Sequence, residues 1–165
     1  MTLKELLLHQ FDNCYDQNGW FVAVRNVIEG VTAEQAAWKA EGTNNSIWES
    51  LAHITYYNNA YVQRLKGIDY KYSITDNDET FEAPEHPTEE EWNSEVAKFD
   101  SVMSEMRGVI AAADESKLSE QVSETNTASW AELISNINAH NAYHGGQMLL
   151  LRKLQGAWNP EAGVS

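Results

Sequence analysis

Apolar residues recur at alternating spacings of three and four along four long segments, and this pattern constrains the fold more than any other feature. Such spacing places the apolar side chains on one stripe of an α-helix. The segments lie near residues 2–28, 46–66, 88–110 and 129–156, and no segment shows the alternation of a β-strand. We therefore expect an all-α protein in which four helices bury their stripes in one shared core, as a four-helix bundle.

Five capping-box patterns support these helix starts. In a capping box a Ser or Thr hydroxyl accepts a first-turn amide hydrogen, and a Glu or Gln three residues later reaches back to the cap. Four boxes open the long segments, and one predicts a short connecting helix near residues 32–39. The pairs are Thr2 with Glu5, Thr32 with Gln35, Ser46 with Glu49, Thr88 with Glu91 and Ser129 with Glu132. Gly30, Gly67 and Gly156 are the expected helix stops.

A long acidic connection, residues 68–87, joins the second and third segments. A connection of this length can cross from one end of a bundle to the other, and such long connections are often functional. The sequence shows no internal repeat and no domain boundary. We expect residues 1–165 to form a single domain, because this length suits one core.

The charge balance excludes several classes of partner. The chain has 11 basic and 25 acidic residues, for a net charge of −14, whereas a nucleic-acid binder needs clustered Lys and Arg. We therefore expect neither nucleic-acid binding nor membrane binding. Cys14 is the only cysteine, so no internal disulfide can form. With no signal-peptide pattern and no apolar run near the roughly 20 residues of a membrane span, the expected location is the cytoplasm.

Two histidines occupy apolar positions of the fourth segment. Its stripe consists of Trp130, Leu133, Ile137, His140, His144, Met148 and Leu151. Residues four apart share one helical face, separated by a rise of about 6 Å, so both imidazoles can bind one metal ion. The alternative is a pair satisfied by hydrogen bonds alone. Burying two imidazoles together is costly, however, and an ion would satisfy both, so the spacing favours a metal site.

A third ligand can come from His9, His53, His86 or a carboxylate. His9 projects roughly opposite the apolar stripe of its helix, so we expect it to be exposed. His86 lies between Pro84 and Pro87, in a loop with no partner spacing. His53 lies at the flank of the second apolar face, beside Leu51 and Ile54. His53 is therefore the best candidate to join the His140 and His144 pair.

Two motifs resemble those of the DinB/YfiT-like family of presumed metalloenzymes. Residues 46–53 read Ser-Ile-Trp-Glu-Ser-Leu-Ala-His, and residues 140–147 read His-Asn-Ala-Tyr-His-Gly-Gly-Gln. The resemblance implies an up-up-down-down bundle with a long crossover between its second and third helices, and commonly a homodimer. It also implies one divalent ion on His53, His140 and His144, with water completing the shell. It does not imply DNA binding.

The chain departs from the family pattern at Gly145, where several members carry Arg or Ile. Together with Gly146, this residue costs a helix about 1 kcal/mol per position relative to Ala. A close approach by another helix, or by a partner chain, is the expected reason; space for a ligand is the alternative.

Three neutral histidines leave open positions on an ion, as in catalytic sites. The ion can activate a thiol, or it can activate water for hydrolysis. We favour thiol transfer mainly because the family resemblance implies it, and because no His-Glu-x-x-His motif or well-spaced base accompanies the histidines. Some DinB-like relatives transfer bacillithiol, mycothiol or glutathione, and others are labelled hydrolases. A third hypothesis is metal or ligand binding without turnover.

The expected ion is zinc or nickel, although iron, manganese or copper also accept imidazole. Tyr57, four residues after His53, is expected to line the pocket, and Gln147 is expected to orient an imidazole. A low-molecular-weight thiol is the expected cosubstrate of a transferase. Ligand imidazoles must be neutral, so we expect acid to release the ion. The metal affinity should fall as the pH drops below the free-histidine pKa of about 6.5.

Overall fold

The computed structural model describes residues 1–42 and 45–162. Within these ranges the chain forms seven α-helices and two short 3-10 helices, with no strand beyond one isolated bridge between Gln121 and Ser129. The elements are α1 (Leu3–Tyr15), α2 (Val24–Ile28), α3 (Ala33–Ala37), α4 (Ile47–Leu65), η1 (Asn77–Thr80), α5 (Glu89–Ala112), α6 (Glu115–Ser119), α7 (Trp130–Leu154) and η2 (Pro160–Ala162). The all-α prediction is confirmed.

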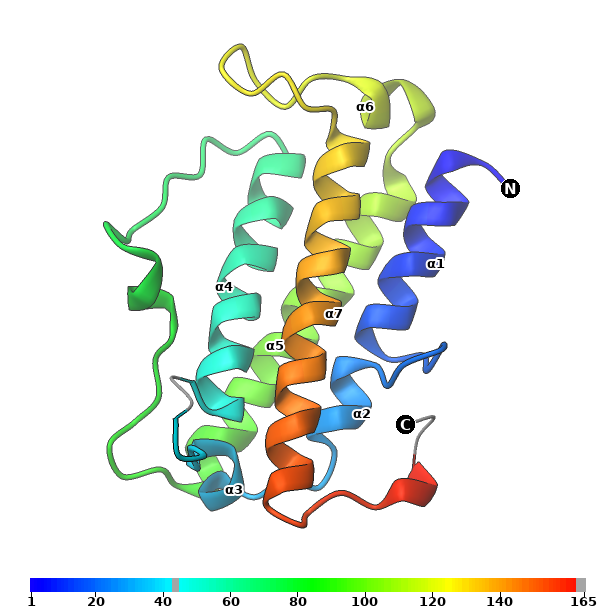
Figure 1. The fold of residues 1–165 in the computed structure, drawn as a ribbon. Helices are drawn as coiled ribbons and strands as arrows, with labels where there is room; N and C mark the ends of the chain where they lie inside the picture. The colour runs from blue at the N-terminus through cyan, green and yellow to red at the C-terminus, as the bar shows by residue number, and fades with distance from the viewer. Residues whose placement is uncertain (43–44, 163–165) are drawn as a thin grey trace.

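The four long helices pack in a ring: α1 contacts α5 and α7, and α4 also contacts α5 and α7. In Figure 1, α1 and α7 run in one direction and α4 and α5 run in the other. The expected up-up-down-down order is therefore wrong. Residues 16–42, which include α2 and α3, lie at the end of the molecule where α1 finishes, so α4 must return in the opposite direction. The long connection after α4 then crosses back along the molecule, as predicted, and α5 starts beside the start of α4.

The structure also interrupts the first predicted helix, because α1 ends at Tyr15 and α2 begins only at Val24. The Asn18 side-chain oxygen accepts hydrogen bonds from the Ala23 backbone amide at 3.0 Å and from the Asn26 side chain at 2.8 Å. Such side-chain bonds give the backbone an alternative to the helix. The apolar spacing of residues 2–28 thus spans a turn rather than one continuous helix.

Helix starts and stops follow the sequence signals closely. All five predicted capping boxes form, at the starts of α1, α3, α4, α5 and α7. Gly30, Gly67 and Gly156 each lie two residues past a helix with a positive φ, which glycine adopts without steric cost. Local chemistry therefore fixes where these helices begin and end.

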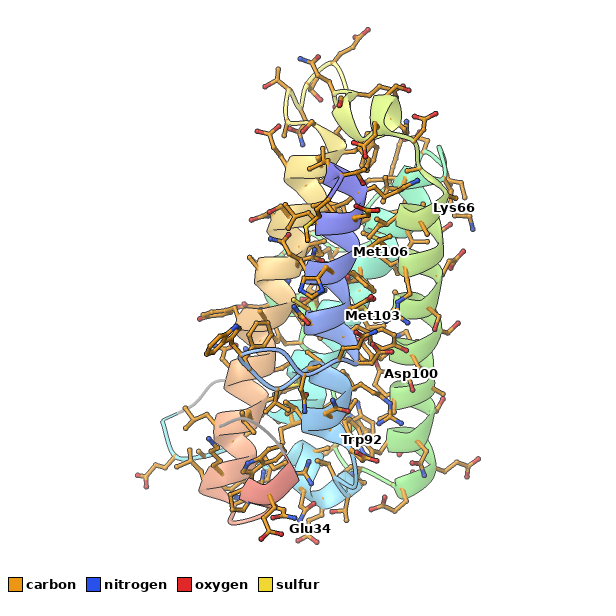
Figure 2. All side chains as sticks on the ribbon, turned by 90° about the vertical axis from the view of Figure 1, so that its right-hand side faces the viewer. Glu34, Lys66, Trp92, Asp100, Met103 and Met106 are labelled. Atoms are coloured by element: carbon orange, nitrogen blue, oxygen red, sulfur yellow. The ribbon has the colours of Figure 1, made fainter. Side chains whose placement is uncertain are left out.

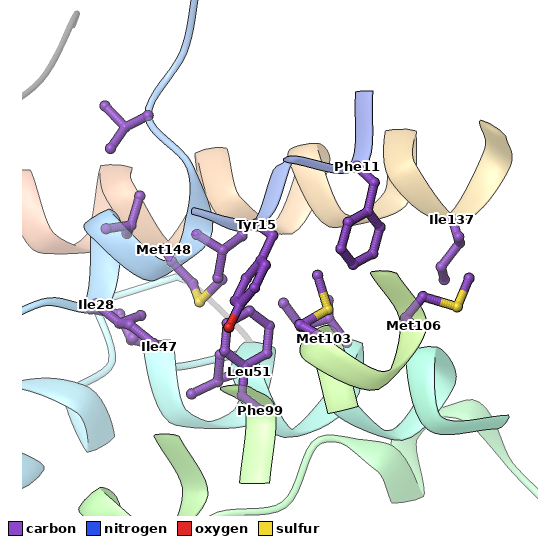
Figure 3. Packing of buried hydrophobic residues seen from close by; sticks show 14 of the residues in the cluster. Phe11, Tyr15, Ile28, Ile47, Leu51, Phe99, Met103, Met106, Ile137 and Met148 are labelled. Carbon is purple, nitrogen blue, oxygen red and sulfur yellow. The ribbon is translucent and has the colours of Figure 1, made fainter. Parts of the chain in front are cut away.

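The core lies between the four long helices and is rich in methionine and aromatic side chains. Figure 3 shows Phe11 of α1, Leu51 of α4 and Met103 of α5 directed into the same space, and all three are fully buried or nearly so. On α5, Trp92, Met103 and Met106 are buried, and Figure 2 shows them along the helix. Each fully buried large side chain stabilises the fold by about 1.5–3 kcal/mol.

Ion pairs join the same helices at the surface. Arg107 of α5 pairs with Asp12 and Asp16, each at 2.7 Å, and Arg25 pairs with Asp100 at 3.0 Å. Partly exposed pairs of this kind contribute at most about 1 kcal/mol each, so the buried stripes dominate the stability. Among the helices of the described ranges, none combines the length and apolarity needed to cross a membrane.

Gly145 and Gly146 lie inside α7 but have different surroundings. A Cβ atom at Gly145 would lie 3.1 Å from Val24 Cγ2, whereas a Cβ at Gly146 would meet no atom within 4 Å. Close packing of α2 on α7 therefore explains Gly145, as expected from the sequence. No contact within the described chain explains Gly146.

We expect Gly146→Ala to raise the free energy of unfolding by up to about 1 kcal/mol, because alanine favours the helix by that amount. Gly145→Ala gains the same propensity but must displace Val24, so its gain should be smaller or reversed. Urea denaturation of the two variants beside wild type measures the difference. Equal stabilisation by both substitutions would show that the Val24 contact imposes no constraint.

Candidate metal centre

Two adjacent helices bring three histidines together. His53 extends from α4, while His140 and His144 extend from α7, one turn apart. One side-chain nitrogen from each histidine lies within 4.8 Å of the others, a grouping that could hold a metal ion. His53 Nε2 lies 3.0 Å from His140 Nε2, and the ring of His144 has its centroid 4.6 Å from each of the other two. The structure thus assembles the three histidines selected from the sequence.

A buried pair of amides aligns α4 with α7 beside the histidines. Asn58 Nδ2 donates to Asn141 Oδ1 at 2.7 Å, and Asn141 Nδ2 donates back to Asn58 Oδ1 at 3.1 Å. Both residues are fully buried. Because a buried amide is costly without a partner, this reciprocal pair favours one register between the helices. The sequence analysis did not assign this role; two asparagines inside apolar helices were the available signal.

The long connection after α4 returns to cover His53. The Nδ1 atom of His53 is hydrogen-bonded to Thr80 Oγ1 at the end of η1. The Phe81 ring stacks on the imidazole with centroids 3.9 Å apart and planes 10° from parallel. Neither Thr80 nor Phe81 was predicted from the sequence, because the connection has no helical or strand periodicity. Its length was the only signal that it has a function.

Burial keeps the three imidazoles neutral. Burial, reinforced by the nearby His144 and His140, lowers the pKa of His53 to about 3. Burial, reinforced by His140, lowers the pKa of His144 to about 4, and an interaction with the Gln147 side chain opposes this shift. Burial also lowers the pKa of His140. The neutral form of an imidazole is the one that binds metals. At neutral pH these three imidazoles therefore need not release a proton before they bind a cation.

The residues present fit a divalent ion. Within the described ranges, the Nδ1 atoms of His140 and His144 are buried and have no hydrogen-bond partner. A buried polar atom without a partner costs about 1–3 kcal/mol, and an ion offsets this cost at each ring that ligates it through Nδ1. Three neutral imidazole nitrogens form a donor set that suits zinc, nickel, copper or iron. The three histidines could therefore hold one divalent ion.

Tyr57 and Gln147 both lie next to the histidines. The Tyr57 ring packs edge-on to His53 and His140, with centroids 5.0 and 5.9 Å away, and its hydroxyl donates to Asn77 Oδ1 at 2.9 Å. The Gln147 side chain opposes the lowering of the His144 pKa, and Gln147 borders a cavity of about 350 Å³. Ser50, Leu150, Leu151 and Leu154 also line this cavity. Binding of a cofactor by either residue remains a prediction.

The other two histidines lie away from this centre. His9 is exposed on α1, where its ring contacts the Asn13 side chain at 3.4 Å. His86 is exposed in the connection before α5. Neither belongs to the histidine group, which agrees with the exclusion of both from their sequence positions.

Comparison with known proteins gives one family. A family model described as the DinB superfamily matches residues 22–148, a range that includes all three histidines and the crossover connection. No curated protein sequence matches the chain. The match covers most of the chain, and the helices and histidines that it spans are those described above. The chain therefore belongs to the DinB superfamily.

Proposed function

We propose that this protein is a metal-dependent thiol S-transferase, with His53, His140 and His144 binding one divalent ion. The observation that carries the proposal is the group of three neutral histidines, two buried and one half-buried, in which the Nδ1 atoms of His140 and His144 have no partner among the described residues. When bound, the ion would lower the pKa of a low-molecular-weight thiol such as bacillithiol or glutathione and so favour its thiolate. Zinc or nickel is the preferred ion.

The charge of the donor set supports a thiolate ligand. Three neutral imidazoles leave the double charge of an ion uncompensated, and burial strengthens the attraction for an anion. Among the described residues, the histidine group contains no Asp or Glu that could act as a base on water from within the group. This favours thiol transfer over the metal-dependent hydrolase that the sequence left as an alternative.

The residues around the histidines support a bound substrate of moderate size. Phe81 and Tyr57 cover the His53 ring, which limits the access of water from that side. The cavity beyond Gln147 combines polar Ser50 with the apolar side chains of Leu150, Leu151 and Leu154. We infer that the electrophile occupies this cavity, with its apolar body against the leucines and its reacting carbon toward His144.

We further propose that the ring of α1, α4, α5 and α7 is the four-helix bundle expected from the sequence and that the protein is a homodimer. Exposed apolar side chains support association: Leu3, Leu6 and Trp20 are 39%, 41% and 100% exposed. A single domain over residues 1–165 and a cytoplasmic location remain predictions from the sequence.

Cobalt substitution tests the proposed activity. Metal-stripped protein is loaded with Co²⁺ and titrated with bacillithiol or glutathione, and thiolate ligation should produce a sulfur-to-cobalt charge-transfer band in the near ultraviolet. With monochlorobimane as electrophile, the native metalloprotein should then accelerate conjugation. Turnover of esters or amides without a thiol would instead support the hydrolase. Absence of both the charge-transfer band and turnover would support a protein that binds a metal or ligand without catalysis.

A further inference from the structure

The hydrogen of the Thr80 hydroxyl has a defined acceptor. Thr80 Oγ1 donates to the Asn77 carbonyl oxygen at 2.7 Å, closing the turn of η1. A hydroxyl has only one hydrogen, so its oxygen must act as the acceptor toward its other neighbour. That neighbour is His53 Nδ1. The hydrogen between Thr80 and His53 therefore belongs to the Nδ1 atom of the imidazole.

This assignment fixes the tautomer of His53. A neutral imidazole has one N–H, so a hydrogen on Nδ1 leaves the Nε2 atom with a free electron pair. Nε2 is the atom that faces the other histidines, 3.0 Å from His140 Nε2. In contrast, the Nδ1 atoms of His140 and His144 have no partner among the described residues. Of the three histidines, His53 is therefore the one whose ligating nitrogen is determined by a hydrogen bond within the chain.

The turn that carries Thr80 is itself held in place. Asp76 caps η1 through a reciprocal capping box with Glu79, and the Tyr57 hydroxyl donates to Asn77 Oδ1 at 2.9 Å. The Phe81 ring, stacked at 3.9 Å, limits rotation of the His53 ring out of its plane. The hydroxyl and the ring therefore meet in a geometry set by the connection rather than by α4 alone.

We propose that Thr80 is a positioning residue that holds His53 as the Nδ1–H tautomer and so presents Nε2 to the ion. The crossover connection is then part of the metal site, although it supplies no ligand. The inference rests on the proposed metal binding at the histidines, but the tautomer itself can be measured in metal-free protein.

Nitrogen NMR of the metal-free protein tests the tautomer directly. Long-range ¹H–¹⁵N correlation spectra at neutral pH should show His53 as the Nδ1–H form in wild type and in Thr80→Ser, which keeps the hydroxyl. Thr80→Val is nearly isosteric but has no acceptor, so His53 should shift toward the Nε2–H form. An Nε2–H tautomer in wild type, or an unchanged tautomer in Thr80→Val, would overturn the proposal.

Metal affinity gives the second readout. Loss of a hydrogen-bond partner of a ligating histidine typically weakens metal binding about 10- to 100-fold, so Thr80→Val should show a loss in this range for Zn²⁺ by competition with a chelator. Thr80→Ser should stay close to wild type. Thr125→Val is the control, because its hydroxyl is exposed and contacts Ser123 rather than a histidine or η1.

The outcomes separate this inference from the proposed function. If Zn²⁺ binds wild type and Thr80→Val equally, the role of Thr80 is wrong and the metal site stands. If Zn²⁺ does not bind at the histidines in any variant, the proposed function fails, and the wild-type tautomer alone decides whether Thr80 holds His53. Should Thr80→Val fail to fold by circular dichroism, the wild-type and Thr80→Ser spectra still decide the question.

Discussion

Replacing both His140 and His144 with alanine should reduce the bound metal from close to one divalent ion per chain to none. Both residues belong to the histidine group, and their loss leaves His53 as the only imidazole in it. One imidazole cannot hold a divalent ion against dilution and washing. Elemental analysis of protein purified without an immobilised-metal column measures the effect.

His9 and His86 supply the matched control for this experiment. Both are exposed and lie outside the histidine group, so His9→Ala with His86→Ala removes as many imidazoles without affecting the site. The control should keep the full metal content of wild type. Equal metal content in wild type and in His140→Ala with His144→Ala would show that the ion binds elsewhere.

Acid should release the metal only well below pH 6.5. From the sequence alone, release of the metal is expected near the free-histidine pKa of about 6.5. Burial lowers the pKa of His53 to about 3 and that of His144 to about 4, so protons compete poorly with the ion until the pH approaches about 4. Zn²⁺ affinity measured by chelator competition should therefore change little between pH 7 and about 5. A steep loss of affinity centred on pH 6.5 would contradict burial of the ligands.

The same pKa shifts make the metal-free protein less stable in acid. Unfolded histidines bind protons as the pH falls below about 6.5, whereas the folded His53 and His144 stay neutral to about 3 and 4. The free energy of unfolding should thus fall between about pH 6.5 and pH 3, by at most about 1.4 kcal/mol per pH unit for each histidine. Urea denaturation of metal-free protein at several pH values measures this dependence. In His140→Ala with His144→Ala, the slope of the free energy of unfolding against pH should be shallower. Parallel slopes for the two proteins would contradict it.

The regular parts of the fold were predictable because their signals are local. A capping box involves residues three apart, and all five boxes in the sequence form in the structure. The pair of His140 and His144 was equally accessible, since residues four apart on a helix must share a face. His53 required more: the sequence placed it at the flank of α4, and only the packing of α4 on α7 brings it to the pair.

The parts that escaped prediction depend on contacts distant in sequence or on side chains that compete with the helix. Asn18 replaces helical bonds with its own, so an apolar spacing that suited one helix spans a turn. Thr80 meets His53 across 27 residues of chain, and no local pattern marks it. The direction of α4 depends on where α2 and α3 lie relative to α1, and the spacing of apolar residues does not determine this.

Asn58 and Asn141 lie between these two cases. Their identity was visible as polar residues inside apolar helices, but their pairing was not, because 83 residues separate them. Only the structure shows that each amide satisfies the other and aligns the helices that carry the histidines.

X-ray absorption at the metal edge, on protein purified without added metal, tests the central claim most directly. The spectrum reports the atoms bound to the ion, independently of any activity. We predict about one ion per chain with three imidazole nitrogens at about 2.0–2.1 Å for zinc, and loss of this pattern in His140→Ala with His144→Ala. A protein without metal, or an ion surrounded by carboxylate oxygens alone, would contradict the assignment of His53, His140 and His144 as its ligands.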